Sequence, residues 1–427
     1  MPDKRRRTAV GLALFVCVGL SHACDGWRDP MTGRRHCRAA PAAIASWSRT
    51  QIGRTPADQA ELEAWIKGHP DAVNAQYGAA CETPLHIAAR LGREDIASLL
   101  LARGANPDTD DEYGNTPVTT AASYGRAEVM KVLVARRVDV NRRGRNGKSP
   151  LVAAVSGLGV EIDLEQRLEV ARILIAAGAD VNARHPSSGS TPLFDAAGMG
   201  TNHSERMIQL LLAHGADVRA VDRHGTPLLV AAAGRGDRTA VQLLLARGAD
   251  VNAADRGGTA LSSAAYGGHL GVVSLLLDRG ADVNRRVPKS RLEWDGLPLA
   301  AALVLAPSPD KMTMAGRREV AEMLIGRGGD VNARTGAGET LLHRTAFEGD
   351  LAAVNLLISH GALLAARDDS GFTPLHRAAK AGHFDVTARL LALGADGRAA
   401  AVDGTTPLTL AAGDAEMEAL IRRQSKD

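Results

Sequence analysis

From residue 83 onward, apolar and polar positions follow one another in short blocks whose spacing predicts pairs of α-helices. The first block opens with Thr83-Pro84 and runs to the alanine pair Ala88-Ala89. Threonine before proline marks a helix start, because the hydroxyl caps free backbone amides and proline fits the first helical position. A second block carries a leucine-rich stripe from Ile96 onward, and glycine after it permits a left-handed helix end. We expect the alanines to let the two helices approach closely, and the leucines to face the next pair.

The same pattern recurs along the chain. It starts at residues 83, 116, 149, 191, 226, 259, 297, 340, 373 and 406, and the commonest spacing between starts is 33 residues. A second signature, Gly-Ala-Asp-Val-Asn at 178–182, recurs in phase and unchanged at 248–252 and 280–284. No single helix pair can bury its apolar face alone, so the core has to come from stacking.

These residues resemble the ankyrin repeat, from residue 83 to about 422, with a degenerate half-repeat from Asp58 to Asn74. The resemblance implies an all-α, curved solenoid of stacked helix-turn-helix units with β-turn fingers. It also implies protein binding through finger tips and first helices along the concave side. We expect an ankyrin-repeat domain over 55–425, with a degenerate N-terminal cap at 55–82, about ten repeats from 83, and a polar C-terminal cap at 406–425.

Two repeats carry a larger residue where the pattern has glycine. Arg137 stands after a second helix, and Cys81 stands in a finger. If the left-handed turn persists at Arg137, its side chain costs about 1 kcal/mol.

Four places hold more residues than the period requires. Extra residues near Val155–Gln166, Ala306–Arg317 and Gly200–Asn202 fall between the two helices of a repeat, and those at Arg285–Trp294 lengthen a finger. The first three emerge from the end of the stack away from the fingers. Insertions that collect on one face often mark a binding face. Neutral growth of tolerant surface loops would give the same pattern.

The first 23 residues have the three parts of a secretory signal peptide. A basic run at Lys4–Arg7 precedes an apolar run of 13 residues, Thr8–Leu20, and small residues lead to a cleavage position after Ala23. The apolar run is short for a membrane span, which needs about 20 residues. We predict cleavage after Ala23 and a periplasmic or secreted protein. An uncleaved anchor and a lipidated Cys24 are the alternatives, and either would add membrane contact.

Residues 24–54 are predicted to form an N-terminal linker. An oxidising compartment favours a disulfide between Cys24 and Cys37, which enclose a short loop. Cys81 would then remain as a structural thiol in a turn.

Charge adds little beyond the N-terminus. Without the first 23 residues, the chain holds 47 basic and 47 acidic residues. A neutral body lacks the basic footprint of a nucleic-acid-binding protein, so we expect no nucleic-acid partner.

No catalytic signature stands out. The patterns H-E-x-x-H, G-x-S-x-G and G-x-x-x-x-G-K-[S/T] are absent, and no Cys/His cluster has zinc-like spacing. We predict that the chain is not an enzyme and uses no cofactor or metal. His86, His343 and His376 stand in the repeat signature, and the resemblance assigns them hydrogen bonds that hold turns together.

Aromatic residues are only 3% of the chain, so the few near fingers and first helices are candidate partner contacts. Tyr113 and Trp294 are expected in fingers. Tyr124, Tyr266 and Phe347 are expected at matching positions just after the alanine pair. Packing within the repeat is the alternative role.

The fingers are unevenly charged. Acidic residues at 108–112 precede a finger with Arg142 and Arg143, and a later finger carries Arg285 and Arg286. These arginines could orient a charged partner. Alternatively, the tips are simply solvated or neutralise one another.

We predict an exported, bacterial ankyrin-repeat protein, acting as a monomer, that binds another exported protein and masks, inhibits or supports it in an immunity-type or accessory role. The bacterial origin rests on the alanine-, glycine- and arginine-rich composition. The alternatives are a secreted effector that acts on a host protein and a membrane-tethered envelope scaffold.

Overall fold

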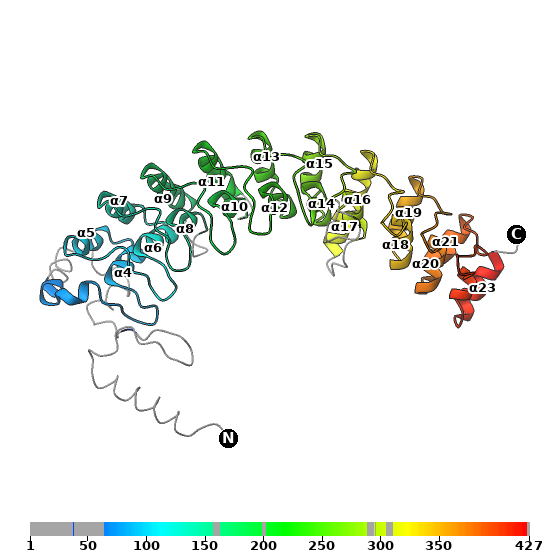
Figure 1. The fold of residues 1–427 in the computed structure, drawn as a ribbon, viewed down its shortest axis with the longest axis horizontal. Helices are drawn as coiled ribbons and strands as arrows, with labels where there is room; N and C mark the ends of the chain where they lie inside the picture. Colours follow the sequence, from blue (N-terminus) through cyan, green and yellow to red (C-terminus); the bar gives the residue numbers. More distant parts are fainter. Residues whose placement is uncertain are drawn as a thin grey trace, which may run out of the picture. The chain divides into compact units, whose positions relative to one another are not determined.

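The computed structural model describes residue 37 and residues 64–424, except 157–162, 199–201, 288–293, 295 and 305–310. The described residues form two compact units, and the first gives way to the second between Asp217 and Val218 of the sequence. Residues 202–205 are grouped with the second unit. In both units the chain runs through successive pairs of helices (Figure 1).

The first unit holds four helix pairs, which a helical segment at 64–68 precedes. Its elements are η1 (Pro70–Val73, a 3-10 helix), α4 (Pro84–Leu91), α5 (Glu94–Ala102), α6 (Pro117–Ser123), α7 (Ala127–Ala135), α8 (Pro150–Ser156), α9 (Leu164–Ala176), α10 (Pro192–Ala197) and α11 (Asn202–Ala213).

The second unit holds six helix pairs and one short antiparallel ribbon. Its elements are α12 (Leu228–Gly234), α13 (Arg238–Ala246), β1 (Ala254–Asp255), β2 (Gly258–Thr259), α14 (Ala260–Tyr266), α15 (Leu270–Asp278), α16 (Pro298–Leu303), α17 (Lys311–Gly326), α18 (Leu341–Glu348), α19 (Leu351–Ser359), α20 (Pro374–Ala381), α21 (Phe384–Ala392), α22 (Pro407–Leu410) and α23 (Ala415–Gln424). In the ribbon, Ala254 pairs with Thr259.

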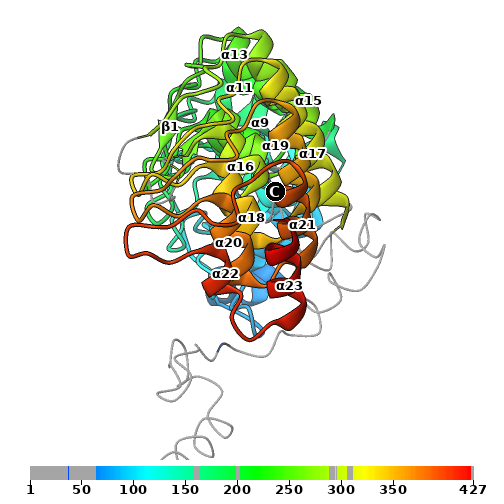
Figure 2. The ribbon, with the colours of Figure 1, turned by 90° about the vertical axis from the view of Figure 1, so that its right-hand side faces the viewer.

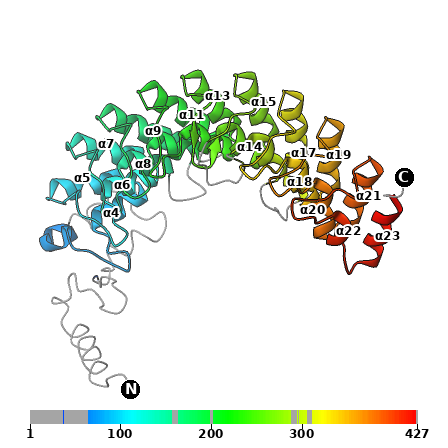
Figure 3. The same cartoon turned by 45° about the vertical axis from the view of Figure 1, so that its right-hand side comes forward.

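Within each unit, first helices lie beside first helices and second helices beside second helices. Figures 1 and 3 show α4, α6 and α8 in one row and α5, α7 and α9 in another. Figure 2 shows the second unit nearly end-on, with the finger loops and β1 on one side, then α18, α20 and α22, then α19, α21 and α23. Each finger therefore lies next to a first helix, on the side away from the second helices.

The predicted core positions are buried. Ala88 and Ala89 of α4, Leu100 of α5 and Leu133 of α7 have no exposed surface. Burying a leucine contributes about 1.5–3 kcal/mol, and every repeat repeats this burial against its neighbours. Stability is therefore distributed along each unit.

Threonines start many of the first helices, as the sequence predicts. In α4 the Thr83 hydroxyl accepts a hydrogen bond from the His86 backbone amide at 3.4 Å, and His86 Nδ1 accepts one from the Thr83 amide at 3.2 Å. This reciprocal cap satisfies amides that the helix itself leaves unpaired. Thr340 with His343 and Thr373 with His376 form the same cap.

Asparagines of the second signature join successive repeats, a role that the sequence analysis missed. Asn182 Nδ2 donates to the Gly215 carbonyl at 3.1 Å, and its Oδ1 accepts from the Asp217 amide at 2.8 Å. Asn332 does the same with Gly361 and Leu363. The side-chain amide of each asparagine thus binds one backbone carbonyl and one backbone amide in the corresponding turn of the next repeat, and this double contact fixes the spacing of neighbouring repeats.

Both residues that replace glycine keep the left-handed backbone. Arg137 has φ +57° and Cys81 has φ +50°, and among the described residues they are the two non-glycine residues with positive φ. The turn geometry of the repeat therefore prevails over the preference of these side chains.

Part of the extra sequence extends helices. The second helix α5 has nine residues, whereas α9 has 13 and α17 has 16. The remainder, at 157–162, 199–201, 288–293 and 305–310, lies outside the described residues. Among the residues that the structure describes, no helix has both the length and the apolar character needed to cross a membrane.

Candidate partner-binding surface

The fingers and first helices of the first unit enclose an open groove of about 690 Å³. Three consecutive fingers and the ends of α4 and α6 contribute to it. The lining residues are Ala80, Glu82, Arg90, Asp111, Tyr113, Asn115, Thr120, Ser123, Tyr124, Asn146 and Lys148.

Hydrogen bonds between fingers build one wall of this groove. The Glu112 amide donates to the Ala80 carbonyl at 2.8 Å, and Asn146 Nδ2 donates to Asn115 Oδ1 at 2.8 Å. Within the first finger, Tyr77 and Glu82 exchange backbone hydrogen bonds of 2.9 and 3.0 Å. The wall is therefore formed before any partner arrives, which lowers the ordering cost of binding.

An ion pair lies at one end of the groove. Arg90 donates from Nε and from one terminal nitrogen to the two carboxylate oxygens of Glu82, at 2.9 and 3.0 Å. This hydrogen bond is the main reason that the pKa of Arg90 is raised, against the opposing effect of its burial. The two-point contact fixes both side chains as part of the groove.

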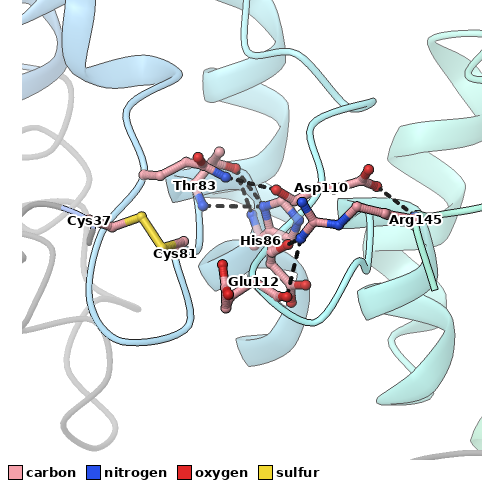
Figure 4. Close-up of a disulfide and its surroundings, with 9 residues drawn as sticks. Cys37, Cys81, Thr83, His86, Asp110, Glu112 and Arg145 are labelled. Atoms are coloured by element: carbon pink, nitrogen blue, oxygen red, sulfur yellow. Dashed lines mark hydrogen bonds between the residues drawn. A yellow bond between two sulfur atoms is a disulfide. The ribbon is translucent and has the colours of Figure 1, made fainter. Parts of the chain in front are cut away.

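A disulfide holds the first finger at this same end (Figure 4). Cys37 is bonded to Cys81, with their Cα atoms 5.4 Å apart, and Cys81 is fully buried. Its chain neighbours Ala80 and Glu82 both line the groove. The disulfide therefore ties the N-terminal segment to the edge of the candidate site.

This bond corrects the cysteine prediction. The expected Cys24–Cys37 pairing is wrong, as is the expectation that Cys81 stays unpaired. The prediction paired Cys37 with Cys24 because the two are close along the chain, and Cys24 lies outside the described residues. The fold instead brings together two cysteines that are 44 positions apart. Loop length is a weak guide when a folded turn presents one of the thiols.

The structure brings two of the predicted aromatic contacts together. Tyr113, 69% exposed, and Tyr124 both line the groove. Tyr124 is half-buried and follows the last residue of α6, whereas Tyr266 is itself the last residue of α14. Tyr124 therefore lies one position later in its repeat than Tyr266 does. The predicted match between these two tyrosines is therefore wrong by one residue.

Tyr266 and Phe347 lie in the second unit and are 48% and 42% exposed. The Arg317 guanidinium carbon lies 5.4 Å from the Tyr266 ring centre, and that of Arg344 lies 6.0 Å from Phe347. Each ring thus gains a cation–π contact within the repeat stack while one part stays accessible. Their role as partner contacts remains a prediction.

Trp294 is a core residue, so its predicted role as an exposed finger contact is wrong. Only 1% of its surface is exposed. The chain turns at this point, with the Leu297 amide donating to the Trp294 carbonyl at 3.0 Å, and the indole lies inside. The sequence indicates that Trp294 belongs to a lengthened finger, but it does not indicate that the ring is buried.

Two arginines of the third finger contact the acidic tip of the second. Arg142 Nε lies 3.2 Å from the Asp108 carboxylate. Arg145 donates to the carbonyls of Asp111 and Glu112 at 3.0 and 3.2 Å, and its amide reaches Asp110 Oδ1 (Figure 4). Pairing between neighbouring tips therefore holds for Arg142 and Asp108, whereas the side chain of Arg145 binds backbone carbonyls.

The other three predicted arginines differ in their exposure. Arg143 and Arg285 are exposed. Arg286 is half-buried and donates to the Arg334 carbonyl at 2.8 Å, which links two fingers of the second unit. Arg286 thus has a structural contact that the sequence did not indicate.

The signature histidines hold turns together, as expected. His86 Nε2 lies 2.9 Å from the Asn115 carbonyl of the next finger, and His343 Nε2 lies 2.9 Å from the Phe372 carbonyl. His376 contacts the Thr405 carbonyl in the same way. Burial lowers the pKa of each imidazole, against the opposing effect of the carbonyl contact. These rings are therefore neutral, with Nε2 donating forward and Nδ1 accepting within the cap.

Sequence reasoning missed three charged residues of the groove, Glu82, Arg90 and Lys148, together with its uncharged lining residues other than the two tyrosines. Arg90 follows the alanine pair of its repeat, and Lys148 precedes a helix start. Arg90 binds Glu82 of the first finger and Lys148 lies in the third finger, so charge at these two positions was a usable signal. Among the described residues, no group of His, Cys, Asp and Glu side chains is arranged to hold a metal ion.

A stack of helix pairs with fingers and a side groove defines a repeat scaffold that presents a binding surface. The family model described as "Ankyrin repeats (3 copies)" matches residues 62–144, 85–185, 193–287 and 311–401, so the chain belongs to the ankyrin-repeat family. Among solved structures, the human ASB11 ankyrin repeat domain is 25% identical, covers 55% of this chain and 98% of its own, and has a TM-score of 0.45. No curated protein matches the chain.

Membership makes the chain a protein–protein interaction module on a scaffold that is typically non-catalytic. The partner is decided by surface residues that differ among members, since the fold alone does not determine what is bound.

Proposed function

We propose that this chain is an exported ankyrin-repeat protein whose first unit binds another exported protein and masks, inhibits or supports it. The groove beside α4 and α6 carries the proposal. It combines an exposed aromatic ring, Tyr113, with fixed polar groups in a cavity of about 690 Å³. Aromatic anchors in a preformed pocket are the usual energetic centre of protein interfaces.

Two features support export. The N-terminal pattern of basic run, apolar run and small residues is typical of a signal peptide. A Cys37–Cys81 disulfide is stable in a periplasm or outside a cell, and reducing cytoplasm disfavours it.

The binding proposal is tested by affinity capture from envelope extracts, with the oxidised full chain as bait. Tyr113→Ala removes an exposed ring and leaves the core intact, so it should lower recovery of a specific partner at least tenfold. Phe384→Ala, which removes an exposed ring at the start of α21 in the second unit, is the matched control and should leave recovery unchanged. Equal recovery by all three baits would place binding away from the groove.

Export is tested by cell fractionation and intact-mass analysis. A mature species that begins at Cys24, and is lighter than its reduced form by two hydrogen atoms, would support export and one disulfide. Recovery in the culture medium would instead favour an effector that acts on a host protein. An uncleaved cytoplasmic species with free thiols would contradict the proposal.

A further inference from the structure

Charge in the groove of the first unit is uneven once its internal contacts are counted. Four charged side chains line it: Glu82, Arg90, Asp111 and Lys148. Glu82 and Arg90 pair with each other through two hydrogen bonds. Asp111 is 4% exposed, and its carboxylate accepts from the amide and the side chain of Asn115 at 2.8 and 3.1 Å.

Lys148 is different. Among the described residues, no carboxylate lies within ion-pair distance of its ammonium group. Its backbone is fixed on both sides, because its amide donates to Asn146 Oδ1 at 3.0 Å and its carbonyl accepts from the Gly144 amide at 3.2 Å. The side chain is half-buried, so a partner carboxylate would meet it with less screening than at an open surface.

Two tyrosines share the groove with this cation. Tyr113 comes from the second finger and Tyr124 from the end of α6, whereas Lys148 comes from the third finger. Aromatic rings accept an apolar side chain by surface burial, and phenol hydroxyls can donate to a carboxylate or a backbone carbonyl. The two rings and the cation together favour a bound segment in which an apolar residue lies next to an Asp or Glu residue.

We propose that the groove binds an extended segment of the partner protein in which an Asp or Glu side chain pairs with Lys148 and an adjacent apolar side chain packs on Tyr113 and Tyr124. This inference rests on the proposed function, and it names the chemistry of the bound segment. Charge complementarity carries it. A basic residue in the same place would face Lys148, and neither carboxylate of the groove is open to it: Glu82 is paired with Arg90, and Asp111 is 4% exposed with its oxygens bonded to Asn115.

The test uses random dodecapeptides displayed on phage, selected against the oxidised full chain. Selected peptides are synthesised and their Kd values measured by fluorescence polarisation. We expect enriched sequences to carry Asp or Glu beside an apolar or aromatic residue. Lys148→Glu should weaken their binding at least tenfold and shift a fresh selection toward Lys and Arg. Lys148→Gln is a milder second variant in case charge reversal disturbs folding.

Lys380→Glu is the matched control, because Lys380 is an exposed lysine at the end of α20 in the second unit. It should leave Kd and peptide preference unchanged. Peptides that lose affinity with Tyr113→Ala but show no acidic preference would overturn this inference and leave groove binding standing. Peptides that are indifferent to both Tyr113→Ala and Lys148→Glu would count against the inference and the proposed function together.

Discussion

Arg137 holds a backbone conformation that favours glycine, at φ +57°. It follows α7, at the position where most other repeats carry a glycine with φ near +84° to +91°. Left-handed backbone brings Cβ close to the following carbonyl oxygen, which costs an L residue about 1–2 kcal/mol. The side chain is exposed, so no packing offsets that cost.

Replacing this arginine should therefore stabilise the first unit. Arg137→Gly is expected to raise the free energy of unfolding by about 1 kcal/mol, after the extra entropy of glycine in the unfolded chain is subtracted. Urea denaturation followed by circular dichroism measures it. The neighbouring Arg136 has φ −87°, so Arg136→Gly should be neutral or destabilising. Equal effects of both changes would show that Arg137 carries no strain.

The buried signature histidines make stability depend on pH. Burial lowers the pKa of His343 below 6.5, so between that pKa and 6.5 the unfolded chain binds a proton that the folded chain does not. Stability is therefore full above pH 6.5 and falls as pH drops below it, by up to about 1.4 kcal/mol per pH unit for each such histidine.

His343→Gln should lower stability at pH 8 and reduce its further loss between pH 6.5 and 5. Urea unfolding at several pH values gives both quantities. Asn332→Ala is the control: it removes hydrogen bonds to Gly361 and Leu363 but no titrating group, so its loss should be similar at every pH. An unchanged pH slope in His343→Gln would argue that this ring is not held neutral.

At the scale of elements, the first finger depends on a bond from outside its repeat. Cys81 belongs to a turn closed by a hydrogen bond from its amide to the Gly78 carbonyl at 3.2 Å, and Cys37 holds that turn from 44 residues away. In the chain-entropy model, closing a loop of this length contributes about 4 kcal/mol. The finger also forms the edge of the candidate groove.

Cys37→Ser should therefore loosen this finger first. We expect a lower unfolding temperature and faster amide hydrogen exchange across Tyr77–Glu82, including the Glu82 amide that pairs with Tyr77. Hydrogen-exchange mass spectrometry measures the exchange in this finger and in the rest of the chain in one experiment. The ribbon Ala254–Thr259 in the second unit serves as the internal control and should not change. Unaltered exchange at Tyr77–Glu82 would mean that the finger is rigid without its disulfide.

Local features were predictable from the sequence, and pairings between distant positions were not. Thr83-Pro84 marks the start of α4 because capping depends on residues a few positions apart. The partner of Cys81, the inward turn of Trp294 and the ion pair of Arg90 depend on which segments the fold places side by side. The groove was predicted in part. Tyr113 and Tyr124 were candidates because aromatic residues are rare in this chain, but the sequence did not single out Lys148 among the charged residues of its finger.

For the whole molecule, a stack in which each repeat contacts its neighbours should respond locally to damage. Leu133 in α7 and Leu357 in α19 are both fully buried, one in each unit. Truncating such a leucine leaves a cavity and costs about 2–5 kcal/mol. Because coupling passes from repeat to repeat, most of the loss should stay near the altered helix.

Leu133→Ala should thus speed amide exchange in α5, α7 and α9 and leave α18 to α21 close to the unaltered protein. Leu357→Ala should do the reverse, so each variant is the control for the other. Groove binding gives a second readout: the first variant should weaken capture of the partner or of selected peptides, and the second should preserve it. Uniform acceleration of exchange throughout both units, from either change, would instead mean that the ten repeats unfold as a single cooperative body, and that the groove draws its stability from the whole chain.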